Sequence, residues 1–250
     1  MDQIEGERSG GRPSHGKTSF GLTLCRGVAK DSDGCPVLFV SAEMTARQLE
    51  QRLLSIHSRT PVFRIRAGQL EDDEFDSQRH QAVRMAAAGH PMFILDGVND
   101  CRAIASICRR YVRKHDVGLI VVDYLGRLFM PGKHEREDLR IGKIVRLFKD
   151  LALETSTAVV LLSQLSRAND KEGREPRLSD LRNSGETEQE ADNILLIHPI
   201  AHDDVSPSPT GILIAKQRQG STGRVELGYH KETMSFEGMF IAPVGAEGRS

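Results

Sequence analysis

The stretch GRPSHGKT, residues 11–18, decides the fold class because it matches the phosphate-loop pattern GxxxxGK[ST]. Glycines in such a loop let backbone N–H groups turn inward around phosphate oxygens. Lys17 is expected to reach the β- and γ-phosphates of a nucleotide, and the Thr18 hydroxyl to bind Mg²⁺. A helix is predicted over residues 18–28, where its N-terminal dipole favours an anion. The same residues also fit a glycine-rich turn without a ligand, so the surrounding pattern has to distinguish the two.

Apolar runs and amphipathic stretches alternate along the rest of the chain. The runs predicted to be buried strands are residues 37–40, 92–95, 119–122, 158–162 and 194–197. Helices are predicted from Thr45, where Gln48 completes a capping box, from about Asp72, and near residues 104 and 141. Strands that are apolar on both faces and alternate with helices predict an α/β fold with a mostly parallel sheet flanked by helices. Residues 212–214 and 225–227 are expected to form antiparallel edge strands near the C-terminus.

Composition and charge exclude several classes of protein. Of the 250 residues, 38% are hydrophobic and 28% charged, and the mean hydropathy is -0.37, which is typical of a soluble globular chain. The net charge of -1 excludes a globally basic DNA-coating protein, and 5% aromatic residues without tryptophan argue against base stacking as the main binding mode. The four cysteines form no CxxC pair, which argues against a zinc site. Without a signal-peptide core or an apolar run of membrane length, the expected location is the cytoplasm, with no membrane partner.

Three polar residues follow predicted strands and are candidates for chemistry. Asp123 ends the run 119–122, and an acid there would lie beside the phosphate loop and hold Mg²⁺ through water, although a strand-ending aspartate can also cap a turn. Glu43 follows the run 37–40 and is suited to act as general base for an attacking water, but it also fits an acid favoured by a helix N-terminus. Gln164 follows the run 158–162 and is suited to sense the γ-phosphate, or it is simply a polar residue at the start of a loop.

Lys216 and Arg218 follow the apolar run 212–215. Residues two apart on a strand point to the same side, so both could project toward a phosphate of a neighbouring subunit. An arginine supplied in trans stabilises transition-state charge and makes hydrolysis depend on assembly. The alternative is an exposed edge strand that charge protects from further pairing.

Two long polar loops, residues 126–138 and 166–185, stand out in a chain of this kind. Such loops are often functional in a compact α/β domain, and surface mobility is the alternative interpretation. The second loop carries both signs of charge in nearly equal number, so it is not a simple basic patch. Contact with phosphates through a few side chains and backbone amides stays open.

Several strings, in this order, resemble the C-terminal motor domain of the DnaB-type replicative DNA helicases, a RecA-like fold. They are GRPSHGKTSF, PVLFVSAEM with the following Gln48-Leu49, LIVVDYL, VVLLSQLSR, LSDLRNSGETEQEAD and IAKQRQGSTGRVEL. The resemblance implies a polar segment over residues 1–10, one ATPase and helicase motor domain over residues 11–240, and a flexible tail over residues 241–250. The family's N-terminal collar domain has no expected counterpart here. Where the family has an apolar strand before the phosphate loop, residues 1–10 contain only Ile4 as a bulky aliphatic residue.

The resemblance also implies cofactors, roles and partners. The cofactors are ATP and Mg²⁺, and Glu43 carries the catalytic base, Gln164 the sensor, and Lys216 with Arg218 the basic pair that completes a neighbour's site. Nucleotide contacts are implied for Gly11, Ser14, His15, Gly16, Lys17, Thr18, Ser19 and Asp123, with Thr18 and Asp123 at the metal, and DNA contacts for Arg182, Asn183 and Gly185. The implied partners are single-stranded DNA, further copies in a hexameric ring, and a helicase loader or primase, with movement from 5′ to 3′.

Two other functions are compatible with the sequence. One is a nucleotide- or DNA-binding module without motor activity, which the polar character of residues 1–10 favours. The other is a RecA-like recombination ATPase, against which the strings SQLSR and AKQR argue.

Overall fold

The computed structural model describes residues 16–31, 33–70, 72–73, 76, 91–132, 137–165, 174–181, 184–200 and 206–238. Its helices are α1 (Lys17–Lys30), α2 (Ala46–Ser58), α3 (Val62–Ala67), α5 (Cys101–His115), α6 (Glu137–Thr155) and α8 (Ser184–Glu190). The 3₁₀ turns are η1 (Leu125–Arg127) and η2 (Leu178–Asp180). Its strands are β1 (Val37–Ser41), β2 (Met92–Asp96), β3 (Leu119–Asp123), β4 (Ala158–Leu161), β5 (Asn193–Pro199), β6 (Ser208–Gln217), β7 (Gly223–His230) and β8 (Ser235–Gly238).

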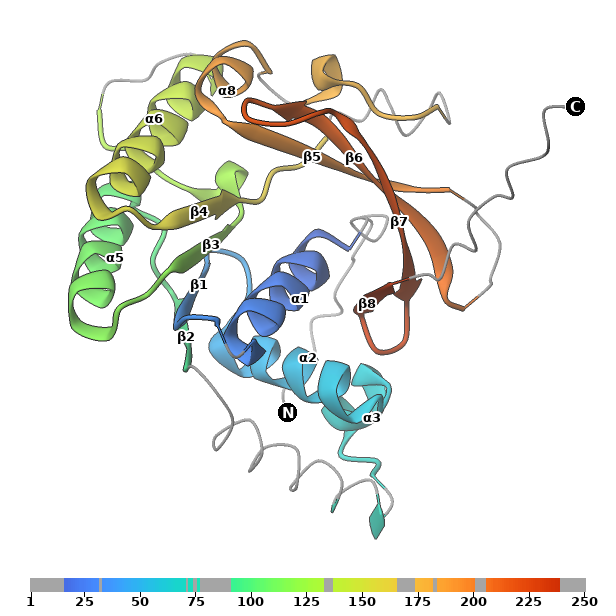
Figure 1. Ribbon diagram of the computed structural model, residues 1–250. Helices are drawn as coiled ribbons and strands as arrows, with labels where there is room; N and C mark the ends of the chain where they lie inside the picture. The colour runs from blue at the N-terminus through green and yellow to red at the C-terminus, as the bar shows by residue number, and fades with distance from the viewer. Residues whose placement is uncertain are drawn as a thin grey trace, which may run out of the picture.

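The first sheet is parallel and has the order β2-β1-β3-β4. Successive side chains of a strand point to opposite faces, and both faces are apolar. Leu38 and Val40 pack with α5 and α6 in one core, whereas Val37 and Phe39 pack with α1 and α2 in the other. Figure 1 shows α5 and α6 on one side of this sheet and α1 on the other. The carboxyl ends of β1, β3 and β4 therefore meet at one edge, close to the start of α1.

The second sheet is antiparallel and has the order β5-β6-β7-β8 (Figure 1). Among the described residues, β4 pairs with β3 and β5 with β6, so the two sheets are separate. A cavity of about 540 Å³ lies between β4, β5 and α6, with Val160, Phe148 and Leu195 among its lining residues. The antiparallel strands expected at the sheet edge thus form a sheet of their own.

Most predicted elements are present, and the fold class is confirmed. The capping box of α2 is formed, because the Thr45 hydroxyl accepts from the backbone N–H of Gln48 and the Gln48 side chain accepts from the backbone N–H of Thr45.

The four cysteines are free thiols, and burial raises the pKa of Cys25 and of Cys108 to about 12. Strand β8 and helices α3 and α8 were not predicted. The helix predicted from Asp72 lies largely outside the described residues, as do residues 1–10 and 241–250.

Candidate functional site

The described chain enters α1 through Gly16, the residue that precedes the helix. Gly16 has φ +77°, a left-handed conformation that residues with a Cβ rarely adopt. A Cβ at this position would also lie 2.9 Å from Cζ of Phe236 on β8. Lys17, Thr18 and Ser19 follow in the first turn of α1, and the N-terminal turn of a helix is a favourable place for an anion. Gly11, Ser14 and His15 lie outside the described residues.

Replacement of Gly16 by alanine is expected to lower the free energy of unfolding by about 1–2 kcal/mol, because the left-handed backbone is strained with a Cβ. Urea unfolding followed by circular dichroism measures the change. The matched control is Gly27→Ala, in the same helix, where a Cβ would meet nothing within 4 Å. That control should raise the stability by about 0.5–1 kcal/mol. A Gly16→Ala protein as stable as the unchanged chain would contradict this account of the loop.

Thr18 and Asp123 form the centre of the site. The Thr18 hydroxyl donates a hydrogen bond of 2.6 Å to Oδ2 of Asp123, which is only 1% exposed at the end of β3. Burial is the main cause that raises the pKa of the Asp123 carboxyl, and the negative charge of Glu43 raises it further. The hydrogen bond from Thr18 and the positive charges of Lys17 and Arg52 lower it. The net shift is upward, so the described groups only partly compensate the negative charge of this carboxylate.

These two oxygen ligands fit a magnesium ion. Mg²⁺ prefers oxygen donors and is commonly held by one or two protein groups together with phosphate oxygens and water. Within the described residues no group of three or more histidine, cysteine or acidic side chains could hold a metal by itself. A divalent cation at Thr18 and Asp123 would also offset the cost of the buried carboxylate. The donor set therefore suits a metal that arrives with a nucleotide.

Glu43 lies at the same sheet edge. β1 and β3 are in register there, with Ser41 beside Asp123, and the Ala42 N–H donates to the Asp123 carbonyl at 2.7 Å. Glu43 is exposed, and its charge contributes to the raised pKa of Asp123. Because Thr45 caps α2, Glu43 precedes the helix and lies in the turn between β1 and α2. This position places a carboxylate that is accessible to solvent near Thr18 and Asp123.

Arg52 on α2 belongs to the same group of charges and was not identified from the sequence. The pKa of its guanidinium is lowered, first by burial and then by Arg66, while Tyr229, Asp123 and Glu43 act in the opposite direction. Its Nε is buried and has no hydrogen-bond partner among the described residues. The available signal was an arginine within the apolar stripe of α2, three residues after Leu49. A cation placed there is suited to face a phosphate.

Gln164 follows β4 at this edge as well. The Leu162 N–H donates to the Val122 carbonyl at 2.9 Å, and the Leu125 N–H donates to the Leu162 carbonyl at 2.9 Å. These bonds continue the pairing of β4 with β3 up to two residues before Gln164, which is half-buried. The structure therefore brings Lys17, Thr18, Glu43, Asp123 and Gln164 to one edge of the parallel sheet.

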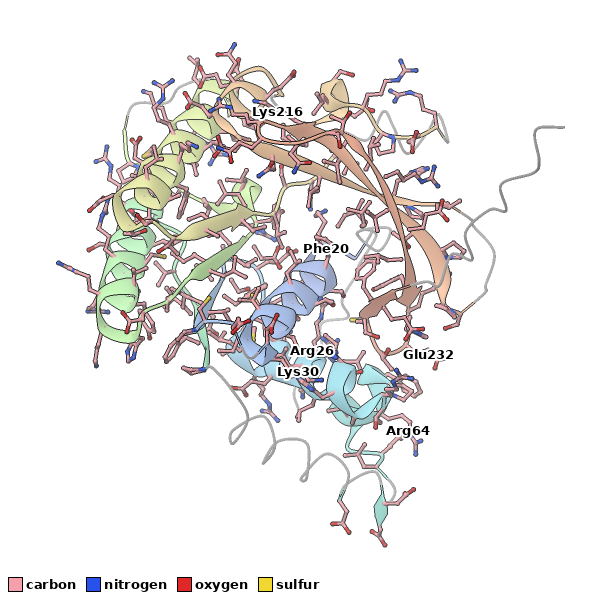
Figure 2. All side chains as sticks on the ribbon, in the orientation of Figure 1. Phe20, Arg26, Lys30, Arg64, Lys216 and Glu232 are labelled. Carbon is pink, nitrogen blue, oxygen red and sulfur yellow. The ribbon has the colours of Figure 1, made fainter. Side chains whose placement is uncertain are left out.

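Lys216 and Arg218 lie elsewhere, Lys216 near the end of β6 and Arg218 just after it. Both contact the C-terminal end of α8 and the residues that follow: Lys216 Nζ donates to the carbonyls of Glu188 and Ala191, and Arg218 donates to Gln189 and Asp192. Figure 2 shows Lys216 beside α8, away from Phe20 on the first turn of α1. The structure therefore does not bring the basic pair to Thr18 and Asp123 of the same subunit.

The residues predicted to contact DNA are only partly described. Arg182 and Asn183 lie outside the described residues, and Gly185 is exposed in the first turn of α8. Before α8, two hydrogen bonds from Arg174 and one from the backbone of Arg177 lower the pKa of Asp180 to about 2.

The described part of the first polar loop, residues 126–138, borders a groove of about 940 Å³ beside α6. Its cationic lining residues are Arg102, Arg127, Arg140, Lys143 and Arg146, and its acidic ones are Glu137 and Asp150.

The parallel sheet, the phosphate-loop motif before α1 and the Thr18–Asp123 hydrogen bond place the chain in the class of P-loop proteins with a RecA-like fold. Comparison with protein families narrows this class: residues 9–238 match the DnaB-like helicase C-terminal domain, and the chain belongs to that family. The family predicted from the sequence is therefore confirmed. The roles of individual site residues stay predictions.

Relatives of the chain include replicative DNA helicases named DnaB. That of Pasteurella multocida is 36% identical over 234 residues, with 91% of this chain and 50% of the relative covered. That of Geobacillus stearothermophilus is 33% identical over 234 residues, with 90% and 50% covered. The chain thus spans about half the length of these curated relatives.

Solved structures agree with this family. A DnaB-like replicative helicase, studied for its interactions with primase, matches with a TM-score of 0.82 at 28% identity, covering 91% of this chain and 56% of that one. A solved structure of an ATPase domain matches with a TM-score of 0.81 at 28% identity, covering 91% of this chain and 82% of that one. A KaiC-like protein of Pyrococcus horikoshii has a TM-score of 0.55 at 15% identity and shares the fold alone. No helix among the described residues is both long and apolar enough to cross a bilayer.

Proposed function

We propose that the chain is the ATP-hydrolysing motor of a replicative-type DNA helicase. The observation that carries the proposal is the hydrogen bond of 2.6 Å from Thr18 to the buried Asp123, at the sheet edge where α1 begins and Glu43 lies nearby. A helix N-terminus, a hydroxyl and a buried carboxylate together suit a nucleoside triphosphate with its metal. Membership of the helicase family supports ATP as that nucleotide.

The chain's own residues divide the work of hydrolysis. Lys17 and the backbone N–H groups of the first turn of α1 hold the β- and γ-phosphates, and Thr18 and Asp123 hold the metal side of the nucleotide. A Mg²⁺ ion held by these two residues would supply positive charge that offsets the negative charge of the transition state. Glu43 orients a water and accepts its proton as the water oxygen attacks the γ-phosphorus. The bond from the γ-phosphorus to the β–γ bridging oxygen breaks, and ADP leaves with that oxygen. Arg52 and Gln164 complete the γ-phosphate side, the first through charge and the second through its neutral amide.

Lys216 and Arg218 serve the site of the next copy in this proposal. In their own subunit they are held at α8, and Arg218 is exposed at the surface. A guanidinium that reaches a neighbour's γ-phosphate stabilises transition-state charge and links hydrolysis to assembly. The proposed assembly is a ring, hexameric as in the resemblance that the sequence indicates.

Single-stranded DNA is the proposed substrate track. The cationic groove beside α6 and the start of α8 at Gly185 offer side chains and backbone amides to phosphates, without extensive aromatic stacking. By family relationship we further propose movement from 5′ to 3′, a primase or loader as partner, and action in the cytoplasm. The structure studied with primase belongs to a relative, and its partner is transferred here only as a proposal.

The proposal is tested by ATP hydrolysis with and without single-stranded DNA, on purified protein whose mass is measured by light scattering. We expect an oligomer whose phosphate release increases when single-stranded DNA is added. The Lys17→Ala protein is the control, because it lacks the cation that holds the phosphates. A monomer without measurable affinity for ATP would overturn the proposal.

A further inference from the structure

Arg218 is held in a defined orientation by the chain segment that follows α8. Its Nη1 donates to Oδ1 of Asp192 at 3.1 Å, and its Nη2 donates to the carbonyl of Gln189 at 2.8 Å. The backbone is fixed as well, because the Arg218 N–H donates to the Asp192 carbonyl at 3.0 Å. A long side chain that would otherwise sample many rotamers is thus tied at both ends to one short stretch.

Asp192 is itself anchored to the core of the domain. Its other carboxylate oxygen accepts from Lys149 on α6, a helix whose apolar face packs against the parallel sheet. The pKa of Asp192 is lowered, chiefly by the Lys149 hydrogen bond and also by the charges of Lys149, Arg218 and Lys216. The carboxylate is therefore ionised at neutral pH and can hold a guanidinium.

The ion pair between Asp192 and Arg218 is partly exposed to solvent. The side chains of Asp192 and Arg218 are 44% and 50% exposed, so the pair is expected to contribute little to the stability of the fold. The turn after β6 is exposed too, and the guanidinium keeps N–H donors beyond the two that Asp192 and Gln189 accept. The ion pair therefore restricts the orientation of the Arg218 side chain more than it stabilises the fold.

We propose that Asp192 is a positioning residue for Arg218, aiming its guanidinium at the γ-phosphate bound by the next copy. This inference rests on the proposed trans role of Arg218 and adds a residue to it. Asp192 does not touch the nucleotide. It acts by restricting Arg218 to an orientation in which little rearrangement is needed when the neighbour's site fills, and misplacement of such a group by about 1 Å can cost about 100-fold in rate.

The test replaces Asp192 by asparagine in the full chain and measures ATP turnover in the presence of single-stranded DNA. We expect kcat to fall about 10- to 100-fold while KM for ATP changes less than about 2-fold, because the phosphate loop is intact. Asp192→Glu, which keeps the charge, should restore part of kcat. The matched control is Glu154→Gln, which removes an exposed carboxylate paired with Arg109 at 2.8 Å and should leave kcat unchanged.

Mixed assemblies separate positioning from a structural defect. Mixing Asp192→Asn with Lys17→Ala chains creates interfaces that combine an intact phosphate loop with an intact Arg218 and Asp192, so turnover should exceed that of either protein alone. An Arg218→Ala and Lys17→Ala mixture is run in parallel. If that mixture recovers and the Asp192→Asn mixture does not, the substitution impairs the ATP site or the fold of its own subunit, and the inference is wrong. If the Arg218→Ala mixture fails to recover, the trans role itself is wrong, and this inference falls with it.

Discussion

Replacing Glu43 by glutamine is expected to lower DNA-stimulated ATP turnover by about 100-fold or more, since a general base contributes about 10²–10⁴-fold to such a step. The amide keeps the size of the side chain but cannot accept the proton of the attacking water. Nucleotide binding should persist, because Lys17, Thr18 and Asp123 are unchanged. Phosphate release and binding of a fluorescent ATP analogue, measured on the same preparation, distinguish these two effects.

The control for Glu43 is Glu50→Gln, which removes an exposed carboxylate from α2, seven residues after Glu43 in the chain. It should turn over ATP like the unchanged protein. Turnover of Glu43→Gln at the unchanged rate would remove the base assignment while leaving the nucleotide site standing.

Replacement of Arg218 by alanine is expected to reduce ATP turnover by about 10³-fold, the lower end of the range for an arginine supplied in trans. ATP binding should change little, because in its own subunit Arg218 lies at α8 and the phosphate loop lies elsewhere. Mixing with Lys17→Ala chains should restore turnover, because some interfaces then combine an intact Lys17 with an intact Arg218.

Arg109→Ala is the control for Arg218, because it removes a surface arginine of α5 that pairs with Glu154. It should retain turnover. Full activity of a preparation made only of Arg218→Ala chains would refute the trans role.

Much of the parallel sheet could be predicted from sequence because its strands are apolar on both faces. Asp123 could be placed at the sheet edge for the same reason, since it directly follows the run 119–122. The phosphate loop then indicated which polar residue at that edge would face a metal. The hydrogen bond between Thr18 and Asp123, which are 105 residues apart, shows that the two residues lie together, whereas the metal role stays a prediction.

Other features depended on contacts that a sequence pattern does not reveal. Helix α8 has the polar sequence SGETEQE and no apolar stripe, and it packs on α6 at Gly142, where a Cβ would fall on the Glu186 carboxylate. Arg52 lies within the apolar stripe of α2, but that pattern does not show that Asp123, Glu43 and Tyr229 lie near its guanidinium. Lys216 and Arg218 reach the end of α8 because β5, which follows that helix, pairs antiparallel with β6. This pairing brings Ile194 beside Lys216.

Gly16, at the end of the phosphate loop, packs closely against Phe236 of the second sheet. Phe236 on β8 also stacks edge-on with Phe20 of α1 and packs against Tyr229 of β7. In the sheet, β7 lies beside β6, and β6 ends at Gln217, between Lys216 and Arg218. Because the three aromatic rings lie between the start of α1 and the second sheet, a displacement of Gly16 toward β8 would be opposed by these contacts. The start of α1 and the strand that carries Lys216 therefore belong to one packed unit of the described chain, because β7 pairs with β6 as well as contacting Phe236.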